Sequence, residues 1–297
     1  MEIPKSISQV LNYKAFKILR LSFESWLDHR DSSRGAALAF YTLFSMTPIL
    51  ILSIAIAGYF FGTEAAQGQI IHQIQSLVGP NGAEAIQALL AAARDPAAGL
   101  WATFVAIVLL IIGATSVFAE LKSTLDDLWG TEHSTVSGIG LLLKTRLLSL
   151  SLVLVLAFLL LISLVVSAML GMLENYVGGV WTNIAPVLKM ISTIFSFLVI
   201  TFLFAIIYKL LPDVELSWHD VMIGAIFTST FFTLGKYFIG LYLGGSAVTS
   251  SFGAAGSIVA IMLWIYYSAQ IFFFGAEFTR QYALQYGSLR TQSIKAK

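Results

Sequence analysis

The strongest constraint on this chain is a series of six apolar runs, each long enough to cross a lipid bilayer as a helix. A spanning helix needs about 20 largely apolar residues. The charged residues make up only 11% of the chain, which leaves too little polar sequence to cover six such helices in water. We therefore predict an all-α, polytopic membrane protein with six transmembrane helices. The predicted spans are 35–61, 100–119, the run between Arg146 and Glu174, the run between Lys189 and Lys209, 220–243 and 254–276.

The distribution of basic residues predicts the orientation of these spans, because Lys and Arg concentrate in cytoplasmic loops. With both termini in the cytoplasm, Arg94 and Lys189 lie outside and Lys236 lies within a span, so the other 14 of the 17 basic residues are inside. The sequence therefore predicts a membrane protein with its N-terminus and its C-terminus in the cytoplasm. Its expected parts are a cytoplasmic N-terminal segment (1–34), a six-span membrane domain (35–278) and a cytoplasmic tail (279–297).

The N-terminal segment has the pattern of an amphipathic helix lying on the inner leaflet. Its basic residues Lys14, Lys17 and Arg20 are predicted to contact anionic lipid. The apolar face of this helix is formed by Phe16, Leu19, Phe23, Trp26 and Leu27.

Two other segments are also predicted to be interfacial. The segment 70–90 is expected to form an external helical hairpin, because a Gly-Pro-Asn-Gly sequence at 79–82 is a strong turn signal. The segment 121–129 has apolar residues at helical spacing and is expected to continue the second span into the cytoplasmic interface.

The arrangement of reactive side chains is not typical of a catalytic or metal site. The chain has no cysteine, and its four histidines are scattered along the sequence. His219-Asp220 is predicted to cap the start of the fifth span. Asp126-Asp127, close to Glu120, is predicted to form a solvated helical face, although nucleases use such clusters to hold divalent ions. We expect no enzymatic activity, no cofactor and no bound metal.

Polar residues in the last two predicted spans are the candidates for a substrate path. An ionisable group in hydrocarbon costs ~2.5–3.5 kcal/mol, so such groups usually face protein, water or a substrate. The alternative to a substrate path is that Ser, Thr and Gln only hydrogen-bond neighbouring helices. For Lys236 the alternative is that its side chain snorkels to the lipid headgroups. The path residues share one helical face in each span; they are Ser229, Thr233 and Lys236 in the fifth and Tyr266, Gln270 and Glu277 in the sixth.

Backbone breakers mark candidate hinges in the same helices. Pro48 removes a backbone donor within the first span and predicts a kink. Gly244 and Gly245 end the fifth span, while Gly253 and Gly256 begin the sixth. These four glycines flank a short external link and are predicted to turn the chain or to gate a path.

Four motifs occur in order along nearly the whole chain. The first is Arg-Gly-Ala-Ala-Leu-Ala-Phe-Tyr at 34–41, followed by Ser45 and Pro48; the others are 121–129, Leu-Leu-Pro-Asp at 210–213, and Phe-Gly-Ala-Ala-Gly-Ser at 252–257, which continues through 263–267 to Gly-Ala-Glu-Phe at 275–278. This combination resembles the YihY/BrkB family of bacterial inner-membrane proteins. The resemblance implies a six-span envelope protein of a kind often described as a transporter.

The expected function is transport or handling of an amphiphilic, anionic envelope substrate, with membrane lipids as partners. The alternative is a structural or assembly factor that organises the cell envelope without translocation. A ribonuclease or other hydrolase, suggested by an older label of the family, is disfavoured because the cytoplasmic loops are short and hold no nucleic-acid-binding fold. No nucleic acid is therefore expected as a partner, and an oligomer is compatible with the sequence.

Overall fold

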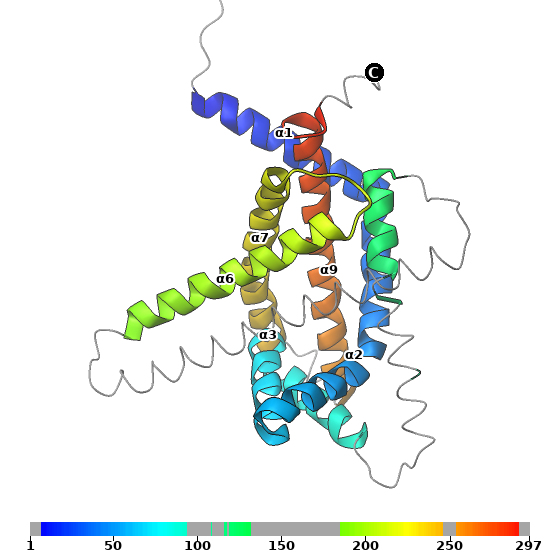
Figure 1. Cartoon of the computed structure of the whole chain (residues 1–297), viewed down its shortest axis with the longest axis vertical. Coiled ribbons are helices and arrows are strands. Elements are labelled where there is room, and N and C mark those ends of the chain that lie inside the picture. Colours follow the sequence, from blue (N-terminus) through cyan, green and yellow to red (C-terminus); the bar gives the residue numbers. More distant parts are fainter. Residues whose placement is uncertain are drawn as a thin grey trace, which may run out of the picture. The chain divides into compact units, whose positions relative to one another are not determined.

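The computed structural model describes residues 7–93, 108, 116–117, 119–131, 185–245 and 254–290. All regular elements in these ranges are helical (Figure 1). The predicted third span lies outside the described residues, as does most of the second. The long helices are α1 (Ile7–Asp28), α2 (Asp31–Phe61), α3 (Thr63–Ala93), α6 (Ala185–Leu210), α7 (Trp218–Gly245) and α9 (Ala254–Gln285).

Three helices in the described part of the chain are long and apolar enough to cross a membrane. They run over Met190–Leu210 in α6, Trp218–Ile239 in α7 and Ile258–Gln285 in α9. These segments correspond to the predicted fourth, fifth and sixth spans. The last helix continues to Gln285, beyond the predicted end of the sixth span at 276.

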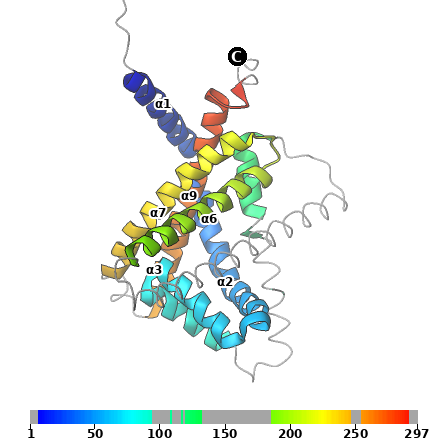
Figure 2. The ribbon, with the colours of Figure 1, turned by 60° about the vertical axis from the view of Figure 1, so that its left-hand side comes forward.

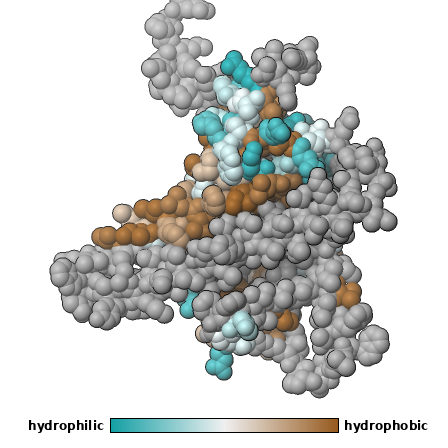
Figure 3. All heavy atoms as spheres, viewed as in Figure 1, coloured by the Kyte–Doolittle hydropathy of each residue, from teal (hydrophilic) through white to brown (hydrophobic). Residues whose placement is uncertain are grey.

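The surface of α6 explains why this helix suits a lipid environment. One face is buried and includes Thr201, Ala205 and Tyr208. The opposite face forms a continuous apolar band in Figure 3. An exposed apolar surface of this kind is stable against lipid and costly against water. Its exposed residues recur at helical spacing; they are Val187, Met190, Ile191, Ile194, Leu198 and Phe202.

The chain divides into two compact units. Unit 1 consists of Met1–His29, Leu125–Thr230 and Phe273–Lys297, and unit 2 consists of Arg30–Thr124 and Phe231–Phe272. Helices α7 and α9 each contribute residues to both units.

The core of unit 2 is formed by α2, α3 and the first half of α9. Ile54, Ile86, Leu90 and Ile261 are buried together there. A single residue, Gly62, links α2 to α3 with φ of 85°. This left-handed conformation favours glycine, which explains how two long helices follow each other with so short a link.

The continuity of α3 corrects one prediction. The helix runs unbroken from Thr63 to Ala93, so the expected hairpin with a turn at 79–82 is wrong. A proline inside a helix costs ~3 kcal/mol. Burial of Ile86 and Leu90, which are 2% and 0% exposed, contributes roughly 1.5–3 kcal/mol each and offsets this cost.

The segment 121–129 is helical as expected, but its apolar face packs on protein. Leu125 and Leu128 are fully buried in unit 1. These two residues therefore contact protein. The continuation of the second span into the cytoplasmic interface stays a prediction.

Helix α1 has the opposite arrangement, because several apolar side chains of its predicted apolar face are exposed. Figures 1 and 2 both show α1 beside the C-terminal end of α9, and these two segments belong to unit 1. Ile18 and Ser22 form part of the buried side of the helix, whereas Phe16 and Phe23 are 68% and 52% exposed. The predicted apolar face is thus available to a membrane surface.

Arg30 carries a local strain that a substitution can test. It is the N-cap of α2, with φ of 55° and ψ of 41°. This left-handed conformation costs an L-residue ~1–2 kcal/mol. We expect Arg30→Gly to raise the free energy of unfolding by about 1 kcal/mol, measured by thermal unfolding of the purified protein. Arg30→Ala removes the same charge but keeps Cβ, and an equal gain in this control would contradict the strain.

Candidate functional site

Close helix packing in unit 1 joins α7 to α9 through paired glycines and threonines. Gly224 of α7 faces Thr279 of α9, and Gly275 of α9 faces Thr228 of α7. The Tyr208 hydroxyl lies 3.0 Å from Thr228 Oγ1, which brings α6 into the same contact. Small residues let helix backbones approach closely in membranes, where apolar burial does not drive association between helices.

A row of polar contacts joins α1 to the end of α9. Gln281 Nε2 donates a hydrogen bond to Ser25 Oγ at 2.9 Å, and Lys17 Nζ donates one to Gln285 Oε1 at 3.2 Å. His29 Nδ1 lies 2.5 Å from Glu277 Oε1. As the residue number rises along α1 it falls along α9, so the two helices pair in antiparallel fashion. We call this row the α1–α9 seam.

Glu277 is the most deeply buried charged residue of the seam. Its side chain is fully buried, whereas that of His29 is 29% exposed. Its second oxygen, Oε2, lies 3.8 Å from the Arg280 guanidinium and accepts no hydrogen bond from the described residues. Placement of a carboxyl group here is costly without a proton or a counter-charge. The sequence singled out Glu277 but gave no sign of its partner His29.

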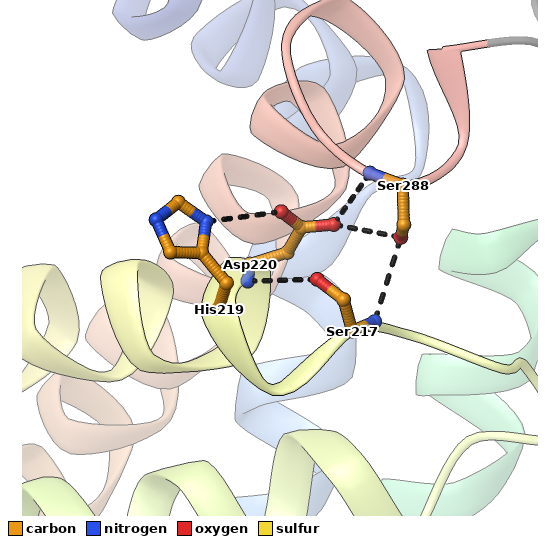
Figure 4. Close-up of polar contacts among 4 residues, drawn as sticks. All are labelled: Ser217, His219, Asp220 and Ser288. Atoms are coloured by element: carbon orange, nitrogen blue, oxygen red, sulfur yellow. Dashed lines mark hydrogen bonds and ion pairs between the residues drawn. The ribbon is translucent and has the colours of Figure 1, made fainter.

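A second polar cluster fastens the start of α7 to the chain after α9 (Figure 4). The backbone N–H and the hydroxyl of Ser288 donate to Asp220 Oδ2 at 2.8 and 2.7 Å. Ser217 Oγ accepts from the Asp220 N–H at 3.2 Å, as expected of an N-cap residue. His219 Nδ1 lies 3.7 Å from Asp220 Oδ1. The Ser217-x-x-Asp220 spacing is that of a capping box, in which the acidic side chain bonds to the backbone N–H of the N-cap residue. Here the Asp220 carboxylate accepts hydrogen bonds from Ser288 instead.

This cluster is a helix cap, as predicted for His219-Asp220, with an additional long-range partner. Gly287 is required beside it, because a Cβ there would lie 2.5 Å from the Asp220 carboxylate. Among the described residues, no group of three or more His, Cys, Asp or Glu side chains is placed to hold a metal. Asp126 belongs to the carboxylate cluster considered above for divalent ions. It accepts a hydrogen bond from the Asp213 N–H at 3.0 Å and so fastens the loop between α6 and α7.

Two of the predicted path residues carry hydroxyls that lack the usual local partner. Ser229 Oγ and Thr233 Oγ1 are buried and make no hydrogen bond within the described part of the chain. Other Ser and Thr residues in these helices donate to the carbonyl four residues earlier, a common arrangement inside helices. Residues with this bond, at 2.7–2.8 Å, are Thr201, Thr228, Thr230, Ser268 and Thr279.

The remaining path residues lie in unit 2, apart from Glu277 in unit 1. Gln270 Nε2 donates to the Ser32 carbonyl at 3.4 Å, while its buried Oε1 has no partner among the described residues. Lys236 and Tyr266 are half-buried, and Lys236 makes no ion pair with a described residue. Within the described chain no hydrogen bond or ion pair joins any two of the six path residues, so a common path stays a prediction.

The candidate hinge residues that the structure describes lie within α2 and at the ends of α7 and α9. The backbone of α2 is helical through Pro48. Gly244 and Gly245 are the last residues of α7, and Gly256 lies in the first turn of α9. Gly253 lies outside the described residues. The kink and the gating role stay predictions.

The lipid-surface candidates lie on α1. Lys17 and Arg20 are exposed, and the side chain of Lys14 lies outside the described residues. Arg20 Nε donates to Glu24 Oε1 at 2.7 Å, and this hydrogen bond raises the pKa of the guanidinium. Contact of these residues with anionic lipid stays a prediction.

Comparison with known proteins identifies relatives along most of the chain. The family described as "Virulence factor BrkB" matches residues 22–297. A UPF0761 membrane protein of Verminephrobacter eiseniae (strain EF01-2) is 25% identical over 250 residues, covering 82% of this chain and 57% of the relative. Another, from Stenotrophomonas maltophilia (strain R551-3), is 26% identical over 261 residues, covering 85% and 58%. The chain thus spans a little over half the length of these curated relatives. No solved structure matches it.

Proposed function

Because the chain belongs to the BrkB/YihY family of multi-pass membrane proteins, we propose that it moves or exposes an amphiphilic, anionic substrate in the bacterial inner membrane. In the topology that we propose, the protein has six spans and both termini lie in the cytoplasm. Polar side chains of α7 and α9 form the path, and membrane lipids are the partners.

The contacts within unit 1 support this topology. The charge distribution assigns α1, the end of the second span, the α6–α7 loop and the end of α9 to the cytoplasmic side. These segments meet in the folded unit, since Asp126 bonds to Asp213, Asp220 to Ser288 and Ser25 to Gln281. Loops and helix ends that pack together lie on the same side of the bilayer, which agrees with the proposed grouping of these segments; the choice of the cytoplasmic side comes from the charge distribution.

The observation that carries the transport proposal is the pair of unpartnered hydroxyls on α7. A buried polar group without a hydrogen bond costs roughly 1–3 kcal/mol. The hydroxyls of Ser229 and Thr233 have no partner in the described part of the chain, while neighbouring Thr228 and Thr230 satisfy theirs on the preceding turn. A conformation that brings water or a polar headgroup to this face regains those hydrogen bonds. The face is therefore suited to a substrate with hydrogen-bonding oxygen atoms.

The surface of α1 supports an anionic amphiphile as the substrate class. Phe16, Phe23 and Leu27 are exposed on a helix that also exposes Lys17 and Arg20. An apolar face with flanking basic residues binds anionic lipid surfaces through both acyl chains and headgroups. This same surface also favours the second candidate function, an envelope-organising factor that binds lipid without moving it.

Transport into vesicles separates the two functions. We expect the purified protein in liposomes to speed the movement of headgroup-labelled phosphatidylglycerol between leaflets, measured with a membrane-impermeant quencher. Ser229→Ala combined with Thr233→Val should slow this movement by roughly tenfold, because each lost hydrogen bond is worth about 0.5–1.5 kcal/mol. Thr230→Val removes a hydroxyl that is already satisfied and should leave the rate unchanged.

Two results would count against transport. Leaflet exchange equal to that of protein-free vesicles, with lipid binding retained, would favour the envelope-organising function. Equal slowing by Thr230→Val would remove the α7 hydroxyl face from the path.

A further inference from the structure

The α1–α9 seam contains one pair of titratable side chains whose exposure differs sharply. Glu277 is fully buried, and its neighbour His29 is 29% exposed. Their atoms Oε1 and Nδ1 lie 2.5 Å apart, a separation that requires a proton between them. The pair therefore connects a buried carboxyl group to water through one imidazole ring.

The charges around this pair come from both helices. Arg280, on α9 itself, lies 3.8 Å from Glu277 Oε2, and Asp28 on α1 is close enough for its negative charge to act on the same carboxyl. The positive charge of Arg280 stabilises the ionised carboxyl group of Glu277, whereas the negative charge of Asp28 destabilises it. The seam's other described bonds, Gln281 to Ser25 and Lys17 to Gln285, involve no second carboxyl group.

We propose that Glu277 and His29 form a proton-binding site that exchanges its proton with the aqueous phase through His29. On uptake, one proton from water forms an N–H or O–H bond within the pair; on release, the same bond breaks and the proton returns to water. In the proposed orientation this water is cytoplasmic. Use of the bound proton to drive substrate movement rests on the proposed function, whereas proton binding itself does not.

Coupled titration is the signature of such a site, because two groups that share a proton do not titrate independently. The test follows the histidine ring signals by NMR as a function of pH, in protein labelled with ¹³C at histidine, with His29→Gln identifying the His29 signal. We expect Glu277→Gln, which keeps the shape of the side chain, to lower the pH at which His29 loses its proton by at least about one unit.

The reverse measurement uses infrared spectroscopy of the carboxylic-acid C=O band. This band should be missing in Glu277→Gln and should move to a different pH in His29→Gln. Ser25→Ala is the matched control, because it breaks a neighbouring bond of the same seam without removing a titratable group. It should leave both titrations unchanged.

Three results would overturn the site: an unchanged His29 titration in Glu277→Gln, an unchanged carboxyl band in His29→Gln, or an equal shift in Ser25→Ala. None of these readouts depends on transport. Loss of the proposed transport function with intact coupled titration would leave the proton site standing.

Discussion

Replacement of Gly275 by leucine is expected to eliminate most of the folded protein. A Cβ at this position would lie 2.7 Å from the Tyr208 hydroxyl oxygen and 2.9 Å from Thr228 Cβ. Both neighbours are only 1% exposed and cannot move into open space. Overpacking costs ~1–3 kcal/mol. Separation of the two hydroxyls also breaks the hydrogen bond between Tyr208 and Thr228, which is worth about 0.5–1.5 kcal/mol.

Together these costs are a large share of the total stability of a typical domain, about 5–15 kcal/mol. The amount of folded protein can be measured as the monodisperse fraction of a fluorescent fusion in detergent, before and after heating. Gly68→Leu is the matched control, because Gly68 also lies in a helix but a Cβ there meets nothing within 4 Å. A Gly275→Leu protein as stable as this control would contradict the packing of α7 against α9.

The helices most readily predicted from the sequence are those whose signal is local. Runs of apolar residues gave the spans of α6 and α7 to within a few residues, because the length of the run and its flanking charges are both contained in the segment itself. The exposed apolar face of α6 agrees with the prediction that lipid covers one side of this helix. Hydropathy also identified 121–129 as a helix, but it could not distinguish a lipid partner from a protein partner.

The error in α3 shows where local signals fail. Gly79-Pro80-Asn81-Gly82 is a turn sequence by every short-range criterion, yet the helix continues through it. The deciding interaction is the packing of Ile86 and Leu90 with Ile54 and Ile261, which lie far away in the sequence. Tertiary burial of this kind cannot be read from a window of neighbouring residues.

In the candidate site too, local patterns identified the polar residues but not their distant partners. Periodicity identified Glu277, Ser229 and Thr233 as polar groups on apolar helices. It could not pair Glu277 with His29, because 248 residues separate them and no local pattern connects them. Nor could it show that Thr228 satisfies its hydroxyl while Ser229 has no partner among the described residues, since periodicity does not fix the side-chain rotamer on which that bond depends.

The second large effect concerns cysteines introduced along α7, for which the cysteine-free chain is an ideal background. The hydroxyls of Ser229 and Thr233 are buried without partners among the described residues, and this cost favours conformations that open their face to water or substrate. Thr228 is buried and bonded to Tyr208, and Thr230 is exposed on the side that faces lipid in the proposed membrane arrangement. Four neighbouring positions of one helix thus have three different environments.

The most direct test of the central claim, that this face of α7 opens to a polar path, is the reaction rate of each single cysteine with a small charged thiosulfonate. The reagent needs water and an ionised thiol, so it reaches neither lipid-facing nor tightly packed positions. The account predicts that Ser229→Cys and Thr233→Cys react at least roughly tenfold faster than Thr228→Cys and Thr230→Cys, a difference of about 1.4 kcal/mol in the cost of exposing the thiol. Equal rates at all four positions, or faster reaction at Thr230→Cys, would contradict it.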